Sequence, residues 1–91
     1  MAKLMWKIDG YDSTTPIYSG EVPGGMTVDE IEVILQRLAC QHLNCEEIVG
    51  ASLRRNFKGH NNLLACHKSD GGRSVMTGGN PHYAARLVDV S

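Results

Sequence analysis

The stretch MTVDEI, from Met26 to Ile31, indicates the start of a helix that lies between strand-like segments. Thr27 and Glu30 have the spacing of a capping box, in which each side chain accepts a hydrogen bond from the backbone N–H of the other residue. Met26 and Ile31 occupy the positions of a hydrophobic staple. Apolar residues then recur along one side of a helix, so the sequence predicts an amphipathic helix over residues 28–43.

Segments with an apolar period of two flank this helix. Leu4, Trp6 and Ile8 lie at every second position, which is typical of a half-buried strand. Asp70-Gly71 is the chemistry of a hairpin turn, because both residues accept positive φ values. Further strands are expected over residues 17–22, 63–68, 73–77 and 82–90.

Segment 45–54 admits two structures. Asn44 and Glu47 repeat the capping-box spacing, which would start a second short helix. The apolar spacing of two at residues 49–53 indicates a strand instead, and Gly50 weakens a helix. We therefore expect a strand over residues 48–54.

These elements predict an α+β fold in which one helix packs on a mostly antiparallel sheet of five or six strands, in the order β-β-α-β-β-β-β. Residues 1–91 form a single domain, because a chain of 91 residues has no room for a second core. One helix leaves part of the sheet uncovered, and Val33 and Cys40 form a small apolar patch away from its buried side. We therefore expect a homo-oligomer, in its simplest form a dimer.

Composition narrows the possible partners and the compartment. A hydrophobic content of 42% and a net charge of −1 predict a globular protein without general affinity for nucleic acid or for membranes. The chain lacks an apolar run of about 20 residues, as a membrane span requires, and lacks a signal-type apolar core near its start. Its three cysteines do not have the spacing of a disulfide framework, so we expect free thiols in the cytoplasm.

Cysteines and histidines gather in two places without the geometry of a metal site. Cys40 and His42 lie about 200° apart around a helix, so they do not face one ion. Cys66 and His67 are neighbours on a strand and point to opposite faces. We therefore predict no metal and no cofactor, and assign no catalytic residue. A small enzyme that uses Cys66 with a histidine is kept as a third class of function.

The only basic cluster is the segment RRNFKGH at residues 54–60. Its cations, Arg54, Arg55 and Lys58, would contact phosphates while Phe57 stacks on a base. The net charge of −1 instead favours a solvated loop, so nucleic acid is not the expected partner.

Two further groups are candidates for binding. His42 projects from the apolar side of the helix in its last turn, where a hydrogen bond to a backbone carbonyl is the simplest role and a place in a helix–sheet cleft is the functional one. Asn80, His82 and Tyr83 follow a pair of glycines, whose backbone N–H groups can approach an anion. Ordinary turn chemistry also explains that segment and is the interpretation we favour.

The whole chain resembles the small orphan proteins carried on mobile gene cassettes of bacterial integrons. The resemblance lies in the segments Gly10–Thr15, Leu35–Ala39 and Gly79–Tyr83. It implies a soluble bacterial α+β protein and transfers no site residue. The expected function is therefore non-enzymatic binding, of a protein partner or of a small ligand at the helix–sheet boundary. Binding of nucleic acid or another anion through the loop 54–60 is the alternative.

Overall fold

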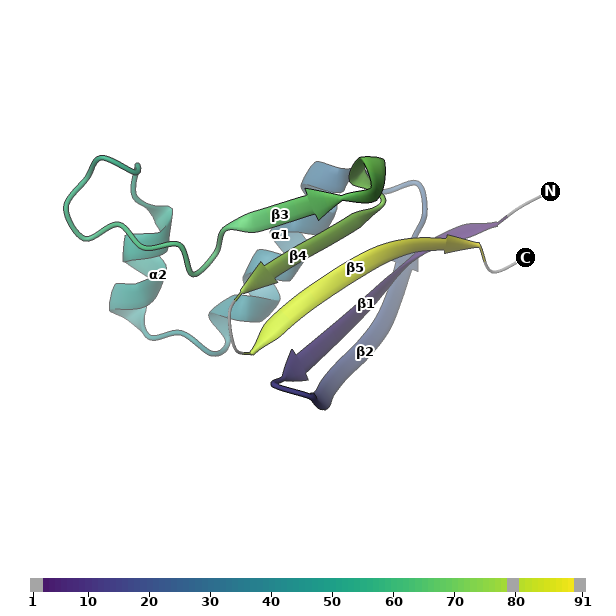
Figure 1. Ribbon diagram of the computed structural model, residues 1–91, viewed down its shortest axis with the longest axis horizontal. Helices are drawn as coiled ribbons and strands as arrows, with labels where there is room; N and C mark the ends of the chain where they lie inside the picture. Colours follow the sequence, from purple (N-terminus) through teal and green to yellow (C-terminus); the bar gives the residue numbers. More distant parts are fainter. Residues whose placement is uncertain (1–2, 79–80, 90–91) are drawn as a thin grey trace.

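The computed structural model describes residues 3–78 and 81–89, which form an α+β fold (Figure 1). Within these residues five strands form one antiparallel sheet in the order β2-β1-β5-β4-β3. The expected class, a helix packed on an antiparallel sheet, is confirmed. The elements are β1 (Leu4–Asp12), β2 (Thr15–Pro23), α1 (Val28–Cys40), α2 (Cys45–Ser52), β3 (Cys66–Ser69), the short 3₁₀ turn η1 (Asp70–Gly72), β4 (Ser74–Gly78) and β5 (His82–Asp89).

Helix α1 begins at the predicted capping box. The Thr27 backbone N–H donates to Glu30 Oε1 at 2.9 Å, and the Glu30 N–H donates to Thr27 Oγ1 at 3.2 Å. The helix ends at Cys40, three residues before the expected end. It packs on β4 and β5, and Figure 1 shows it on the far side of the sheet, behind β3 and β4.

The core lies between α1 and one face of the sheet. Side chains alternate along a strand, so Trp6 and Ile8 of β1 face the helix together with residues of β4 and β5. The Trp6 indole N–H donates to the Met26 carbonyl at 3.0 Å and so fastens β1 to the start of the helix. The fully buried members are Trp6, Ile8, Ile31, Leu35, Ala39, Val75, Thr77, Tyr83 and Ala85.

The expected strand over residues 48–54 is wrong, because residues 45–52 form helix α2. The capping box supplies the reason: the Asn44 N–H donates to Glu47 Oε1 at 2.9 Å, and the Glu47 N–H donates to Asn44 Oδ1 at 2.8 Å. Gly50 does not end this helix. A Cβ there would lie 2.5 Å from Asn61 Nδ2 and 2.7 Å from the Gly59 carbonyl oxygen, so glycine permits the following loop to approach.

The strands near the C-terminus correspond to the predicted hairpin. The expected strand at 63–68 is shorter and later, at Cys66–Ser69, because residues 63–65 belong to the loop that leads into it. The Asp70-Gly71 turn is confirmed, with φ of 54° and 64°. Lys68 on β3 pairs with Glu32 on α1 at 2.9 Å, which ties this edge of the sheet to the helix. No helix in the described ranges is long and apolar enough to cross a bilayer.

Candidate functional site

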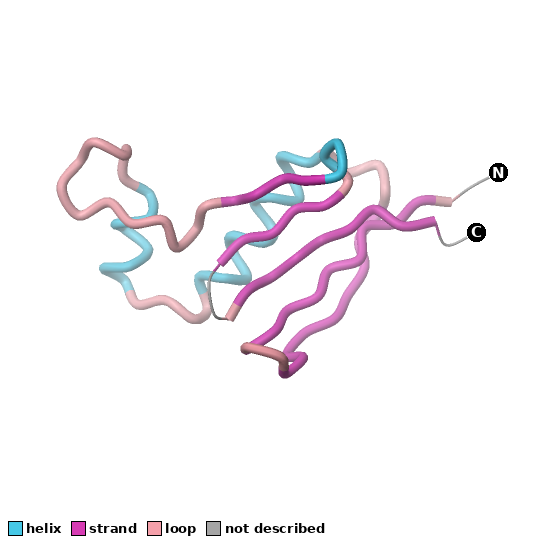
Figure 2. Tube along the Cα trace, viewed as in Figure 1, coloured by secondary structure: helices cyan, strands magenta, loops and turns pink. Residues whose placement is uncertain are grey.

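Helix α2 and the loop that follows it, residues 44–65, form a lobe at the end of the molecule opposite to the chain termini (Figures 1 and 2). We call it the α2 lobe. Asn61 organises it: its backbone N–H donates to the Gly50 carbonyl at 3.2 Å and its amide Nδ2 to the Glu47 carbonyl at 3.0 Å. Its Oδ1 accepts from the Leu63 N–H at 3.0 Å. The loop is therefore held against α2 by the backbone and the side chain of Asn61 rather than by a strand ladder.

Two side chains of the main body anchor the end of the lobe. The Gln36 side chain on α1 donates to the Leu64 carbonyl at 3.0 Å. The buried Thr77 hydroxyl on β4 donates to the Ala65 carbonyl at 2.9 Å. The loop thus returns to the sheet at a defined place, beside the start of β3.

A hollow of about 440 Å³ lies where the loop meets β3, and its lining is Arg55, His60, Asn62, Ala65 and His67. His60 is fixed from both sides, because Nδ1 lies 3.0 Å from the Leu53 carbonyl oxygen and Nε2 lies 3.0 Å from Asn62 Oδ1. Both ring nitrogens thus face oxygen atoms, and which nitrogen donates depends on the tautomer of the histidine. The lining contains an arginine, two histidines and an amide, and among these described residues no carboxylate opposes them.

The cations of the basic loop, residues 54–60, are exposed and available. The Arg54 guanidinium carbon lies 5.7 Å from the centroid of the Phe57 ring, a cation–π contact on a ring that is 48% exposed. Within the part of the chain that the structure describes, Arg54, Arg55 and Lys58 take part in no ion pair. Their charge is therefore not neutralised by a neighbouring side chain.

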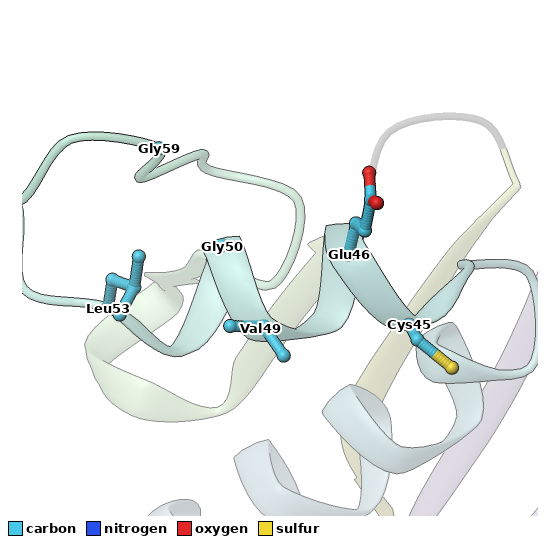
Figure 3. A pocket seen from close by; sticks show the side chains of 6 residues that line it. All are labelled: Cys45, Glu46, Val49, Gly50, Leu53 and Gly59. Carbon is cyan, nitrogen blue, oxygen red and sulfur yellow. The ribbon is translucent and has the colours of Figure 1, made fainter.

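A second, largely apolar hollow of about 330 Å³ lies on α2 itself. Figure 3 shows Gly59 of the loop facing Gly50, with Leu53 between loop and helix and the Cys45 sulfur pointing away from the loop. Val49, which is 59% exposed, lies on the same helix. The remaining lining residue is Glu46.

The predicted candidates at the helix–sheet boundary form a pair. His42 Nε2 and the Tyr83 hydroxyl lie 2.7 Å apart, a hydrogen bond whose donor depends on the histidine tautomer, and the two rings stack. The partner of His42 is thus a tyrosine hydroxyl rather than the expected backbone carbonyl. Burial raises the pKa of Tyr83, so this phenol stays protonated at neutral pH. Neither of the two hollows described above involves this pair.

The other predicted residues are distributed over the molecule. His82 stacks on Tyr11 on the sheet face opposite to α1. Asn80 lies outside the described residues. Arg55 enters the hollow, whereas Arg54 and Lys58 are elsewhere on the same loop.

Sequence reasoning did not assign His60, Asn62 and His67 to the site. His60 and Asn62 stand in or beside the basic segment, which is the one local signal for them. His67 was expected on the opposite face from Cys66, and it is, because Cys66 pairs with buried Thr77 and His67 with exposed Met76. Its approach to Arg55 depends on the path of the loop and has no signal in the sequence.

The cysteines are free thiols in the structure. Burial raises the pKa of the half-buried Cys66 thiol, which opposes formation of the nucleophilic thiolate. Among the described residues no group of three histidine, cysteine or acidic side chains is placed to hold a metal ion. Comparisons with protein families, with curated proteins and with solved structures find no significant match to this chain.

Proposed function

We propose that the protein is a non-enzymatic binding protein that holds a phosphate-bearing small ligand in the hollow between the basic loop and β3. The observation that carries this proposal is the convergence of Arg55 from the loop and His67 from β3 on one hollow with His60 and Asn62. A volume of about 440 Å³ falls in the range of small-ligand sites. Anion binding through the loop 54–60, which the sequence offered as the alternative function, is therefore the function that we place first.

The chemistry of the lining fits an oxyanion. Arg55 presents a fork of N–H donors that matches two oxygens of one phosphate. The rings of His60 and His67 and the amide of Asn62 add polar groups around the same space. Phe57, two residues after Arg55 on the same loop, offers an exposed ring on which a base or another flat group can stack.

The small number of cations favours a small ligand over a long nucleic acid. Affinity for nucleic acid grows with the number of phosphates that lysine and arginine neutralise. The basic loop offers three such residues, and the chain as a whole has a net charge of −1. Three free thiols also support a reducing compartment, the cytoplasm, as the place of this function.

Calorimetric titration of the full chain with inorganic phosphate, a nucleoside monophosphate and a ten-nucleotide single strand, at about 0.15 M salt, tests the proposal. We expect the monophosphate to bind more tightly than phosphate, because it adds stacking on Phe57. Arg55→Ala should weaken binding by about tenfold or more, since a charge-assisted pair is lost. Arg37→Ala, which removes an exposed arginine of α1, is the matched control and should change nothing.

Two outcomes would contradict the proposal. One is the absence of binding by the wild type at millimolar ligand. The other is equal affinity of the wild type and Arg55→Ala. If the single strand binds more tightly than the monophosphate, and log K falls with log salt by about 0.7 per phosphate contacted, the ligand is nucleic acid instead.

A further inference from the structure

The sheet face opposite to α1, which we call the outer face, has no cover among the described elements (Figures 1 and 2). Because Trp6 and Ile8 face the helix, their neighbours along β1 point the other way. Met76 of β4 lies on this face and is 46% exposed. The strand register also brings Tyr11, Ala84 and Val88 to it.

The outer face also carries two positive and two negative side chains. Lys7 and Arg86 are direct cross-strand partners on β1 and β5, and Glu21 stands on the other side of Lys7. Asp9 lies one row further along β1. Within the described ranges none of these four takes part in an ion pair. Like charges at directly opposed positions destabilise a sheet. Of this pair only Lys7 has a carboxylate, that of Glu21, as a direct cross-strand partner, so the pair gains from a further negative charge above it.

We propose that a second copy of the chain covers the outer face, through a two-fold axis that runs across the strands between the row of Lys7 and the row of Asp9. Such an axis exchanges the two rows, so Lys7 of each copy lies over Asp9 of the other. The strands of the two sheets stay aligned, as in a face-to-face sheet packing with a separation of about 10 Å. The contact is isologous and closes as a dimer.

The size of the face lies at the lower end of what such a contact needs. At a rise of about 3.3 Å per residue and a strand spacing of about 4.8 Å, the five strands present about 550 Å² of flat sheet before the relief of side chains is added. A standard interface buries about 800 Å² per partner. Pairing along the edge strand β2 is less favourable, because Pro16 and Pro23 near its ends have no N–H to donate.

Sedimentation of charge-reversed variants tests the proposed axis. The wild type should be a dimer at micromolar concentration, and Lys7→Asp or Asp9→Lys alone should raise the dimer dissociation constant at least tenfold, because each places like charges at both contacts. Mixing the two variants in equal amounts should restore a dimer, since opposite charges meet again at both contacts. This restoration also shows that each variant is folded.

The matched control is Lys58→Asp, which makes the same change of net charge on the basic loop and should leave the dissociation constant unchanged. A wild type that stays monomeric at tens of micromolar would overturn the inference. So would a dimer that neither single variant weakens, or variants whose mixture remains monomeric. The hollow does not include Lys7 or Asp9, but its His67 lies on the outer face at the β3 edge. Phosphate binding is therefore also measured on the Lys7→Asp variant, whose hollow is unchanged, so that failure of one proposal is distinguished from failure of the other.

Discussion

Tyr83 on β5 covers Gly10, its register partner on β1. A Cβ at Gly10 would lie 2.5 Å from Tyr83 Cε1 and 2.7 Å from Cδ1, so the missing side chain makes the space that the ring fills. The Tyr83 hydroxyl then meets His42, just after the end of α1. One glycine on β1 thus sets the position of the ring that closes the boundary between helix and sheet.

Gly10→Ala should therefore lower the free energy of unfolding by about 1–3 kcal/mol, the usual cost of overpacking a core. Denaturant midpoints of the wild type and the variant measure it. Gly25→Ala is the control, because no atom lies within 4 Å of a Cβ there, and it should change stability by less than about 0.5 kcal/mol. Equal midpoints for Gly10→Ala and the wild type would mean that the ring does not occupy this space.

Tyr83 also predicts a loss of stability in alkali. Burial raises the pKa of Tyr83 above its ordinary value of 10.0, so the folded state favours the neutral phenol. The contribution of this phenol to the free energy of unfolding is complete below pH 10.0. It is lost as the pH rises from 10.0 through the raised pKa of the folded state, because the unfolded chain gives up the proton first. Unfolding free energies between pH 8 and 11 should therefore fall more steeply for the wild type than for Tyr83→Phe.

Burial also raises the pKa of Cys66, so this thiol contributes to the pH dependence as well. The wild type and Tyr83→Phe both retain Cys66, so the difference between their pH profiles reports Tyr83 alone. The variant should start about 1 kcal/mol less stable at pH 7, since it lacks the hydrogen bond to His42. Parallel pH profiles for the two proteins would show that Tyr83 ionises equally in the folded and unfolded chains.

The start of α1 gives a third prediction. Thr27→Ala should destabilise the protein by about 1 kcal/mol, because it removes the acceptor of the Glu30 N–H. Thr27→Ser keeps a hydroxyl at the same place and should retain most of the stability. Chemical denaturation of the three proteins decides it, and an alanine variant as stable as the wild type would mean that the cap contributes nothing.

The features that depend on neighbours in the chain were predictable from the sequence, whereas those that depend on distant residues were not. The cap at Thr27, the alternation along β1 and the Asp70-Gly71 turn depend on neighbours in the chain, and each was predictable. The α2 segment was misread because Gly50 suggested a weak helix, whereas the glycine serves contacts with a loop nine and eleven residues away. Local propensity carries no information on such a contact.

In the candidate site, likewise, one part was predictable from the local sequence and another part was not. The basic segment 54–60 was visible from its composition, and Arg55 within it lines the hollow. His67 joins Arg55 only because Thr77 and Gln36 fix the end of the loop beside β3. These hydrogen bonds join residues that are 12 and 28 positions apart, and no motif spacing indicates them.

The last prediction uses Gly50 to test how the α2 lobe is held. Alanine favours a helix interior over glycine by about 1 kcal/mol, so propensity alone predicts that Gly50→Ala stabilises α2. The structure predicts the reverse, because the new Cβ would displace Asn61 and the Gly59 carbonyl from the helix. The Asn61 N–H, which donates to the Gly50 carbonyl, and the Leu63 N–H, which donates to Asn61, should then exchange with solvent faster. Hydrogen exchange of these two amides, with the Ile31 amide of α1 as an internal reference, measures the effect. Unchanged or slower exchange at Asn61 and Leu63 would show that the lobe does not depend on this close approach.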